Sequence, residues 1–245
     1  MNQVRLSLAT DECSKMLEVR QSIRDTIPVM LGVIPFGITC GIMGNTAGLT
    51  NLETIMMSLL VFAGASQFVA ITMLSAGITG WGIIILTTLL INLRHLIMGA
   101  SLAPYMMKLP VRLQAILSFG LVDESYALTA SRINSSGYSA YYQLACSVVL
   151  YIAWAISTTI GVIAGSYIND PLQWGLDIAM PATFLVLLMP RLVDKQSVVV
   201  CVIAAVTAVL GALYLPGKWY IILACLLGTV IGGMMERGEA NDHAE

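Results

Sequence analysis

The sequence predicts an all-α integral membrane protein with about eight transmembrane segments, some of them broken or kinked. Of its 245 residues, 58% are hydrophobic and only 11% are charged, and the mean hydropathy is +0.84. Soluble domains carry about 25% charged residues because their surfaces face water. Half of the charged residues lie at the two ends of the chain. We therefore expect a cytoplasmic N-terminal segment at 1–25, a polytopic transmembrane domain at 26–235 and a polar C-terminal tail at 236–245.

Apolar segments make up most of the transmembrane domain. Each is close to the ~20 residues that a helix needs to cross about 30 Å of hydrocarbon. Because backbone groups in lipid must hydrogen-bond within the protein, we expect helices, and no segment alternates with the period of a barrel strand. The segments are 26–48, 53–76, 81–103, 113–131, 141–166, 172–190, 197–215 and 217–235.

The fourth segment is the least secure, because Asp123 and Glu124 lie at its middle. If it does not cross, the chain has seven spans. Lysine and arginine concentrate in cytoplasmic loops, so the arrangement that places more of them inside is favoured. With eight spans and a cytoplasmic N-terminus, the inside holds eight of these residues and the outside three, whereas seven spans give six and five. We expect eight spans with both termini cytoplasmic, which leaves Lys108 and Arg112 outside.

Two segments are expected to contain kinked or broken helices. Pro35 lies within the first segment and Pro181 within the sixth. Proline removes a backbone donor and clashes with the preceding turn, so a kink or break is expected near each. Such kinks are common in membrane helices, and broken helices also form the binding sites of transporters. These prolines alone do not decide between the two interpretations.

Glycine pairs spaced four residues apart predict closely packed helix faces, since small residues let membrane helices approach each other. We expect most of these pairs to pack within the chain, and the last pair is the best candidate for a partner surface. The pairs are Gly37 and Gly41, Gly161 and Gly165, and Gly228 and Gly232.

Polar residues occur at about the same depth in three neighbouring segments. The second is centred on Gly64-Ala65-Ser66-Gln67, the third on Asn92, and the fourth on its two acidic residues. A charged residue at this depth costs roughly 2.5–3.5 kcal/mol by insertion scales. Pairing within the helix bundle or contact with a wet cavity can offset that cost. We therefore expect these residues to meet in the interior of the protein.

Arg94 is expected to pair with Asp123 or Glu124. The pair could be purely stabilising, but two acids and one base leave a carboxylate over. That carboxylate, with His95 nearby, is a candidate proton carrier, although a lone membrane histidine is more often a hydrogen-bonded packing residue. Asp177, which lies near the start of its segment and four residues before Pro181, joins the candidates for proton coupling or ion pairing.

The run from Gly64 to Gln67 has two interpretations. If the helix breaks there, free N–H groups and the positive dipole end of the second half would suit the carboxylate of an amino acid. Ser66 could then cap the half-helix, and Gln67 and Asn92 could contact the substrate. Alternatively, Gly64 and Ala65 mark a tight helix crossing. The sequence leaves both open.

Four stretches in series resemble the AzlC-like branched-chain amino-acid permeases, over residues 20 to 235. The resemblance implies the large subunit of a secondary transporter in a bacterial inner membrane. It further implies export of valine, leucine and isoleucine, in some members methionine, driven by the proton gradient, and a small hydrophobic AzlD-like partner of about four spans. Ile178 and Met180 stand where the family commonly has other apolar residues. The stretches are Phe62-Ala63-Gly64-Ala65-Ser66-Gln67-Phe68, Asn92-Leu93-Arg94-His95, Asp123-Glu124-Ser125-Tyr126-Ala127-Leu128 and Leu176-Asp177-Ile178-Ala179-Met180-Pro181-Ala182-Thr183-Phe184.

Other classes are less compatible with the residues present. The chain has no Gly-x-Ser-x-Gly elbow, no His-Glu-x-x-His motif and no phosphate-binding loop, so an enzyme is not expected. Five cysteines without paired spacing predict no metal or cofactor site, and no nucleic-acid partner is expected. A channel or a structural subunit of a membrane complex remains the alternative, but the polar residues concentrate at one depth instead of lining a pathway. A faint likeness between Phe62–Phe68 and Phe119–Tyr126 is too weak to establish an internal repeat.

Overall fold

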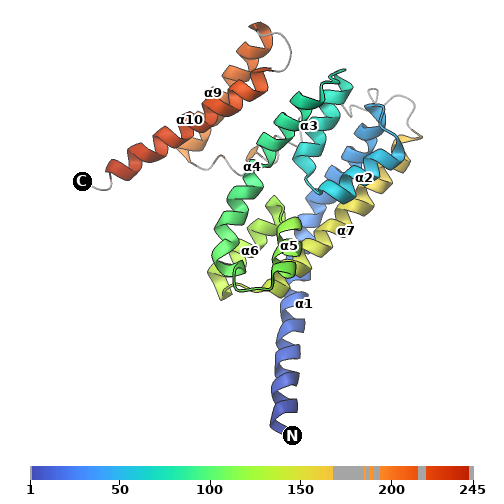
Figure 1. The fold of residues 1–245 in the computed structure, drawn as a ribbon, viewed down its shortest axis with the longest axis vertical. Helices are drawn as coiled ribbons and strands as arrows, with labels where there is room; N and C mark the ends of the chain where they lie inside the picture. The colour runs from blue at the N-terminus through green and yellow to red at the C-terminus, as the bar shows by residue number, and fades with distance from the viewer. Residues whose placement is uncertain are drawn as a thin grey trace. The chain divides into compact units, whose positions relative to one another are not determined.

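The computed structural model describes residues 2–167, 185, 188–189, 192, 194–214 and 219–242, and their regular structure is helical (Figure 1). The chain divides into two compact units, Met1–Asp177 and Ile178–Glu245. Asp177, Pro181 and most of segment 172–190 lie outside the described residues. The helices are α1 (Asn2–Thr46), α2 (Asn51–Val61), α3 (Gly64–Ser75), α4 (Trp81–Met106), α5 (Val111–Phe119), α6 (Asp123–Ser136) and α7 (Ala140–Gly165) in the first unit, and α9 (Lys195–Tyr214) and α10 (Trp219–Asp242) in the second.

Four of the described helices are long and apolar enough to cross a membrane. They include α4, α7 and α9, which match three of the predicted segments closely. The fourth is the part of α1 at Lys15–Thr46. The helix α1 runs through both the predicted N-terminal segment at 1–25 and the first apolar segment. Likewise, α10 continues into the predicted tail and ends at Asp242.

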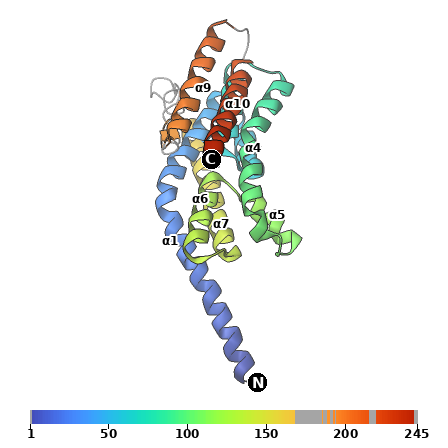
Figure 2. The ribbon, with the colours of Figure 1, turned by 90° about the vertical axis from the view of Figure 1, so that its left-hand side faces the viewer.

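The predicted break at Pro35 is wrong, since α1 is one continuous helix through Pro28 and Pro35. Packing against α7 explains this continuity, because the two helices lie side by side (Figure 1 and Figure 2) and touch both before the proline, at Ser22, and after it, at Gly41. The Thr39 hydroxyl also donates a hydrogen bond to the Pro35 carbonyl at 2.9 Å. One lost backbone bond is a small cost against this long contact.

The glycine pairs pack within the chain as predicted. On α1, a Cβ added at Gly41 would collide with the backbone of Thr158 in α7, and one added at Gly161 would collide with the backbone of Ile38 in α1. Backbone can meet backbone here only because both positions are glycine. The pair at Gly228 and Gly232 lies against Val200 of α9. This face is therefore used inside the second unit, although it was the best candidate for a partner surface.

The segment predicted as the second span is a helical hairpin. Phe62, with a φ of 45°, and Ala63 separate α2 from α3. Gln67 in α3 nevertheless donates a hydrogen bond to Ser58 in α2 at 3.0 Å. In one continuous helix, nine residues would separate these side chains by about 13 Å along the axis. Hence α3 folds back alongside α2, and the hairpin starts beside the end of α1, where Thr54 meets Gly44.

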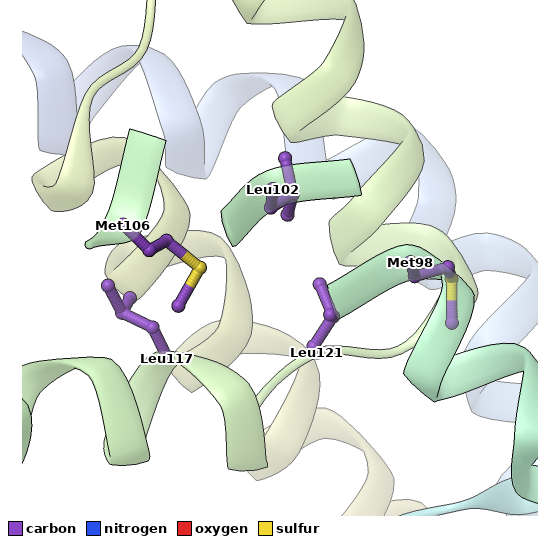
Figure 3. Packing of buried hydrophobic residues seen from close by; sticks show 5 residues of the cluster. All are labelled: Met98, Leu102, Met106, Leu117 and Leu121. Carbon is purple, nitrogen blue, oxygen red and sulfur yellow. The ribbon is translucent and has the colours of Figure 1, made fainter. Parts of the chain in front are cut away.

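The segment predicted as the fourth span is also a hairpin, formed by α5 and α6. Both helices run along the C-terminal half of α4. From α5, Leu117 packs among residues of α4 in the cluster Met98, Leu102, Met106, Leu117 and Leu121 (Figure 3). From α6, the Tyr126 hydroxyl shares a 3.0 Å hydrogen bond with Ser101 of α4. Arg132, in the second half of α6, pairs with Glu18 of α1, so this hairpin lies at the opposite end of the unit from α2 and α3 (Figure 1).

The tips of the two hairpins meet in the middle of the first unit. Phe62 ends α2 and Phe119 ends α5, and their ring centroids are 6.4 Å apart. Both rings pack on Tyr151 of α7, at centroid distances of 5.1 and 6.0 Å. The Tyr151 hydroxyl in turn donates to the Leu59 carbonyl at 2.9 Å. An aromatic cluster therefore separates the two ends of the unit at this point.

The order of elements around the two hairpins is the same, with the direction inverted. A long helix followed by a hairpin occurs twice, as α1–α2–α3 and as α4–α5–α6, and the two long helices run in opposite directions. Each second half-helix has a serine in its first turn. Ser66 donates to the carbonyl of Ala63 at 2.9 Å and Ser125 to that of Val122 at 3.0 Å. The faint likeness between Phe62–Phe68 and Phe119–Tyr126 thus coincides with the two helix breaks.

Candidate functional site

The polar residues singled out from the sequence gather at the two hairpin tips, and α4 connects them. The Asn92 amide donates to the Ser66 hydroxyl of α3 at 3.3 Å. Two residues further on, the Arg94 guanidinium forms an ion pair with Asp123, the first residue of α6. One helix thus holds both tips through neighbouring residues. The predicted pairing of Arg94 is present, and within the described part of the chain it is formed with Asp123.

The remaining ionisable candidates lie around this ion pair. Glu124 follows Asp123 in the first turn of α6 and is half-buried. His95 follows Arg94 on α4, is also half-buried, and lies within electrostatic range of both Arg94 and Asp123. A cation, two carboxylates and an imidazole therefore occupy the centre of the unit, where charge is costly unless it is paired or functional.

The N-terminus of α3 begins without a side-chain cap. The residue before it, Ala63, has no side-chain acceptor, whereas α2 begins with a capping box at Thr50. The predicted cap by Ser66 is wrong, since its hydroxyl donates to the Ala63 carbonyl and does not cap the first-turn amides. The first intrahelical bond comes from the Gln67 amide, which donates to Ala63 at 3.1 Å. Three N–H groups before it have no partner within the helix.

Gln67 belongs to a buried chain of hydrogen bonds between three helices. Its Nε2 donates to Ser58 of α2, and the Ser58 hydroxyl donates to Thr158 of α7 at 3.3 Å. All three side chains are buried, with Gln67 only 1% exposed. Its Oε1 and the Oδ1 of Asn92 have no hydrogen-bond partner among the described residues. Two buried acceptors are thus left over near the start of α3.

Aromatic rings surround Gly64, the first residue of α3. Phe36 of α1 stacks on Phe68 at a centroid distance of 4.4 Å and meets Trp154 of α7 edge-on at 5.6 Å. A Cβ at Gly64 would come within 3.0 Å of Trp154 and 3.2 Å of Phe36. Sequence reasoning missed these rings, as well as Ser58 and Thr158, because apolar rings and hydroxyls are ordinary in membrane helices.

A second polar cluster lies around Glu18 and Asp25 of α1, at the end of the unit away from α2 and α3. Besides the Glu18–Arg132 ion pair, the Tyr142 hydroxyl donates to Asp25 at 2.9 Å. Burial raises the pKa of Tyr138, in the loop after α6, to about 12, so this phenol stays protonated and donates to Gln143 at 2.9 Å. The sequence did not indicate these contacts, because the partners of Glu18 and Asp25 follow more than a hundred residues later.

The site is made of protein groups that bind by hydrogen bonds and charge. Among the described residues, no group of three His, Cys, Asp or Glu side chains is placed to hold a metal ion. Cys40 and Cys146 are buried free thiols, and Cys201 is partly buried. An ion pair beside unpartnered amide oxygens is chemistry that suits a small charged or zwitterionic molecule.

Fold and site together define a multi-pass helical membrane protein with a polar centre between two opposed hairpins. Residues 28–168 match the family described as AzlC protein. The chain belongs to this family of membrane transport proteins.

Similar proteins cover nearly the full chain. A membrane protein of Archaeoglobus fulgidus is 32% identical over 90% of this chain and 96% of its own length. The inner membrane protein YgaZ of Escherichia coli K12 is 30% identical over 86% of each chain. The branched-chain amino acid transport protein AzlC of Bacillus subtilis 168 is 27% identical over 91% of this chain and 88% of its own. No solved structure matches the chain.

Proposed function

We propose that this chain is the large subunit of a secondary transporter that exports branched-chain amino acids. The observation that carries the proposal is the meeting of two opposed helical hairpins around buried polar groups. Inverted repeats with discontinuous helices and a central site are the usual architecture of secondary transporters. The name of the Bacillus subtilis relative supports valine, leucine and isoleucine, and by extension methionine, as substrates.

The substrate binds at the tip of the first hairpin. The uncapped amides of Gly64, Ala65 and Ser66 lie at the positive end of the α3 dipole, which suits a carboxylate. The spare acceptors on Gln67 and Asn92 suit the ammonium group. An amino acid offers both groups on one carbon, so it can use donors and acceptors that the protein leaves unpaired.

Proton coupling takes place at the tip of the second hairpin. Arg94, Asp123 and Glu124 supply one cation and two carboxylates beside His95. A proton on one carboxylate would loosen its hold on Arg94 and free the α6 tip to move relative to α4. Asn92 and Arg94 both belong to α4, so a movement of α4 relative to α6 would also move Asn92 at the substrate site. Asp177 belongs to the same proposal from the sequence alone.

The first unit also suggests how the chain is oriented. Between residues 15 and 167, every Lys and Arg except Arg94 lies at the end where α1 begins. By the positive-inside rule this end is cytoplasmic. Both hairpins are then re-entrant and do not cross the membrane. Lys108 and Arg112, which eight spans would leave outside, then lie inside. We place the protein in the bacterial inner membrane beside a small AzlD-like subunit.

Cysteine labelling from the two sides of the membrane tests this orientation. In a chain lacking its native cysteines, Met107→Cys is expected to react only from the cytoplasm and Thr79→Cys only from outside. Eight full spans predict the reverse for both positions, because α2 and α3 would then cross the membrane as one span before either position is reached. Asn51→Cys, outside in either arrangement, is the control for access of the reagent. Reaction of Met107→Cys from outside would overturn the re-entrant arrangement of the first hairpin.

Counterflow tests the transport function. Proteoliposomes holding the chain and its AzlD-like subunit are loaded with unlabelled leucine and given labelled valine, leucine, isoleucine or methionine, with and without a pH gradient. A carrier accumulates label transiently, and a pH gradient changes the accumulation if protons are coupled. Folded protein that exchanges none of the four would contradict the proposed substrate class. Uptake without counterflow would instead indicate a channel.

A further inference from the structure

We infer that Trp154 of α7 is a specificity-determining residue of the transport site, with its indole N–H bound to the substrate carboxylate. This inference rests on the proposed function and deepens it. Trp154 lies outside every motif that the sequence predicted for the site, and its position on α7 is far along the chain from the first hairpin. Three observations on the indole ring and its neighbours carry the inference.

The first observation is that the indole N–H lacks a partner. Trp154 is only 5% exposed, yet its Nε1 has no hydrogen-bond partner among the described residues. A buried tryptophan N–H normally donates a hydrogen bond, and burying it without an acceptor is unfavourable. Its own backbone carbonyl, by contrast, accepts a hydrogen bond from Ser157 at 3.0 Å. The donor is therefore the unused group of an otherwise well-packed residue.

The second observation is the position of the ring beside the uncapped helix start. The ideal Cβ of Gly64 would lie 3.0 Å from Cη2 and 3.4 Å from Cζ2 of Trp154. Only one ring atom separates Cζ2 from Nε1, so the N–H belongs to the edge of the indole that meets Gly64. The indole ring of Trp154 thus lies beside the first residue of α3. Two kinds of N–H at one place suit a carboxylate.

The third observation concerns what else the site offers. The unpartnered acceptors of Gln67 and Asn92 lie on the same stretch of α3 and on α4 beside it. Phe36 and Trp154 present apolar rings in an edge-on pair. Donors, acceptors and an apolar wall match the carboxylate, the ammonium group and the aliphatic side chain of one ligand. Trp154 contributes both a donor, its indole N–H, and part of the apolar surface, its ring.

The test compares leucine with leucinol, which has the same side chain and ammonium group but no carboxylate. Leucine counterflow is measured in wild type and in Trp154→Phe, with leucinol as a competing inhibitor. We expect Trp154→Phe to raise the KM for leucine about 10-fold and to leave the inhibition constant of leucinol within about twofold, as for one lost hydrogen bond to a charged group. Trp81→Phe is the matched control, because Trp81 is 73% exposed at the start of α4.

Each other outcome overturns the inference in a recognisable way. An equal loss for leucine and leucinol means that the ring only packs. A variant indistinguishable from Trp81→Phe means that Trp154 is outside the site. If wild type exchanges no branched-chain amino acid, the proposed function fails and the inference fails with it. Melting temperature is measured for every variant, and if Trp154→Phe is unstable, Trp154→Tyr, which also lacks the indole N–H, takes its place.

Discussion

Replacing Gly64 with alanine is expected to lower the rate of leucine counterflow strongly, and replacing it with valine should abolish counterflow. A Cβ at this position would lie 3.0 Å from Trp154 and 3.2 Å from Phe36, so the rings must shift. Overpacking of this kind costs about 1–3 kcal/mol, and each 1.4 kcal/mol corresponds to a factor of ten. We therefore expect about 10- to 100-fold slower counterflow for alanine. Initial rates in proteoliposomes measure it.

Gly99→Ala provides the matched control for this substitution. Gly99 lies within α4, and a Cβ there would have no atom within 4 Å. Alanine also favours helix more than glycine does, so this variant should be as active and at least as stable as wild type. If Gly64→Ala transports like Gly99→Ala, the tip of the first hairpin is not the substrate site. Melting temperatures of both variants show whether a loss of rate reflects a loss of folding.

The helices of this protein were predictable from its sequence, but the way two of them fold back was not. Hydropathy measures how many apolar residues a segment has, and 53–76 has enough for one span or for a hairpin. The break falls at Phe62 and Ala63, where no proline marks it. At Pro35, where a kink or break was expected, α1 continues as one helix beside α7. Tertiary packing, which a local pattern does not contain, decides both cases.

The candidate site was predictable where charge is involved. A buried Arg94 needs a nearby acid, so the sequence alone predicted its partner among two neighbouring residues, and the structure pairs it with Asp123. Neutral groups carry no such requirement. Ser58 and Trp154 look like any hydroxyl or ring in a membrane helix until the fold brings them beside α3. Their part in the site depends on contacts between residues that are far apart in sequence.

The Arg94–Asp123 pair is expected to be essential for transport, even in a double variant that regains the stability lost when one partner is removed. Arg94→Ala or Asp123→Ala leaves a partly buried charge without its partner, since these side chains are 34% and 17% exposed. A fully buried pair would lose about 3–5 kcal/mol on removal of one partner, and this exposure reduces the loss to about 1–2 kcal/mol. The double variant removes both charges and should recover most of the melting temperature. Counterflow should stay at least about 100-fold below wild type in all three, because the coupling groups are gone.

The Glu18–Arg132 pair supplies the comparison that separates stability from transport. It joins α1 to α6 at the cytoplasmic end in the proposed orientation, away from the hairpin tips, and its side chains are 23% and 9% exposed. Glu18→Ala and Arg132→Ala should each lower the melting temperature, and the double variant should recover both stability and counterflow. If the variant with both Arg94→Ala and Asp123→Ala also recovers counterflow, and if a pH gradient still changes that counterflow, the Arg94–Asp123 pair only stabilises the fold. Loss of transport at the centre alone means that the charges themselves take part, since both pairs join helices and both are removed in the same way.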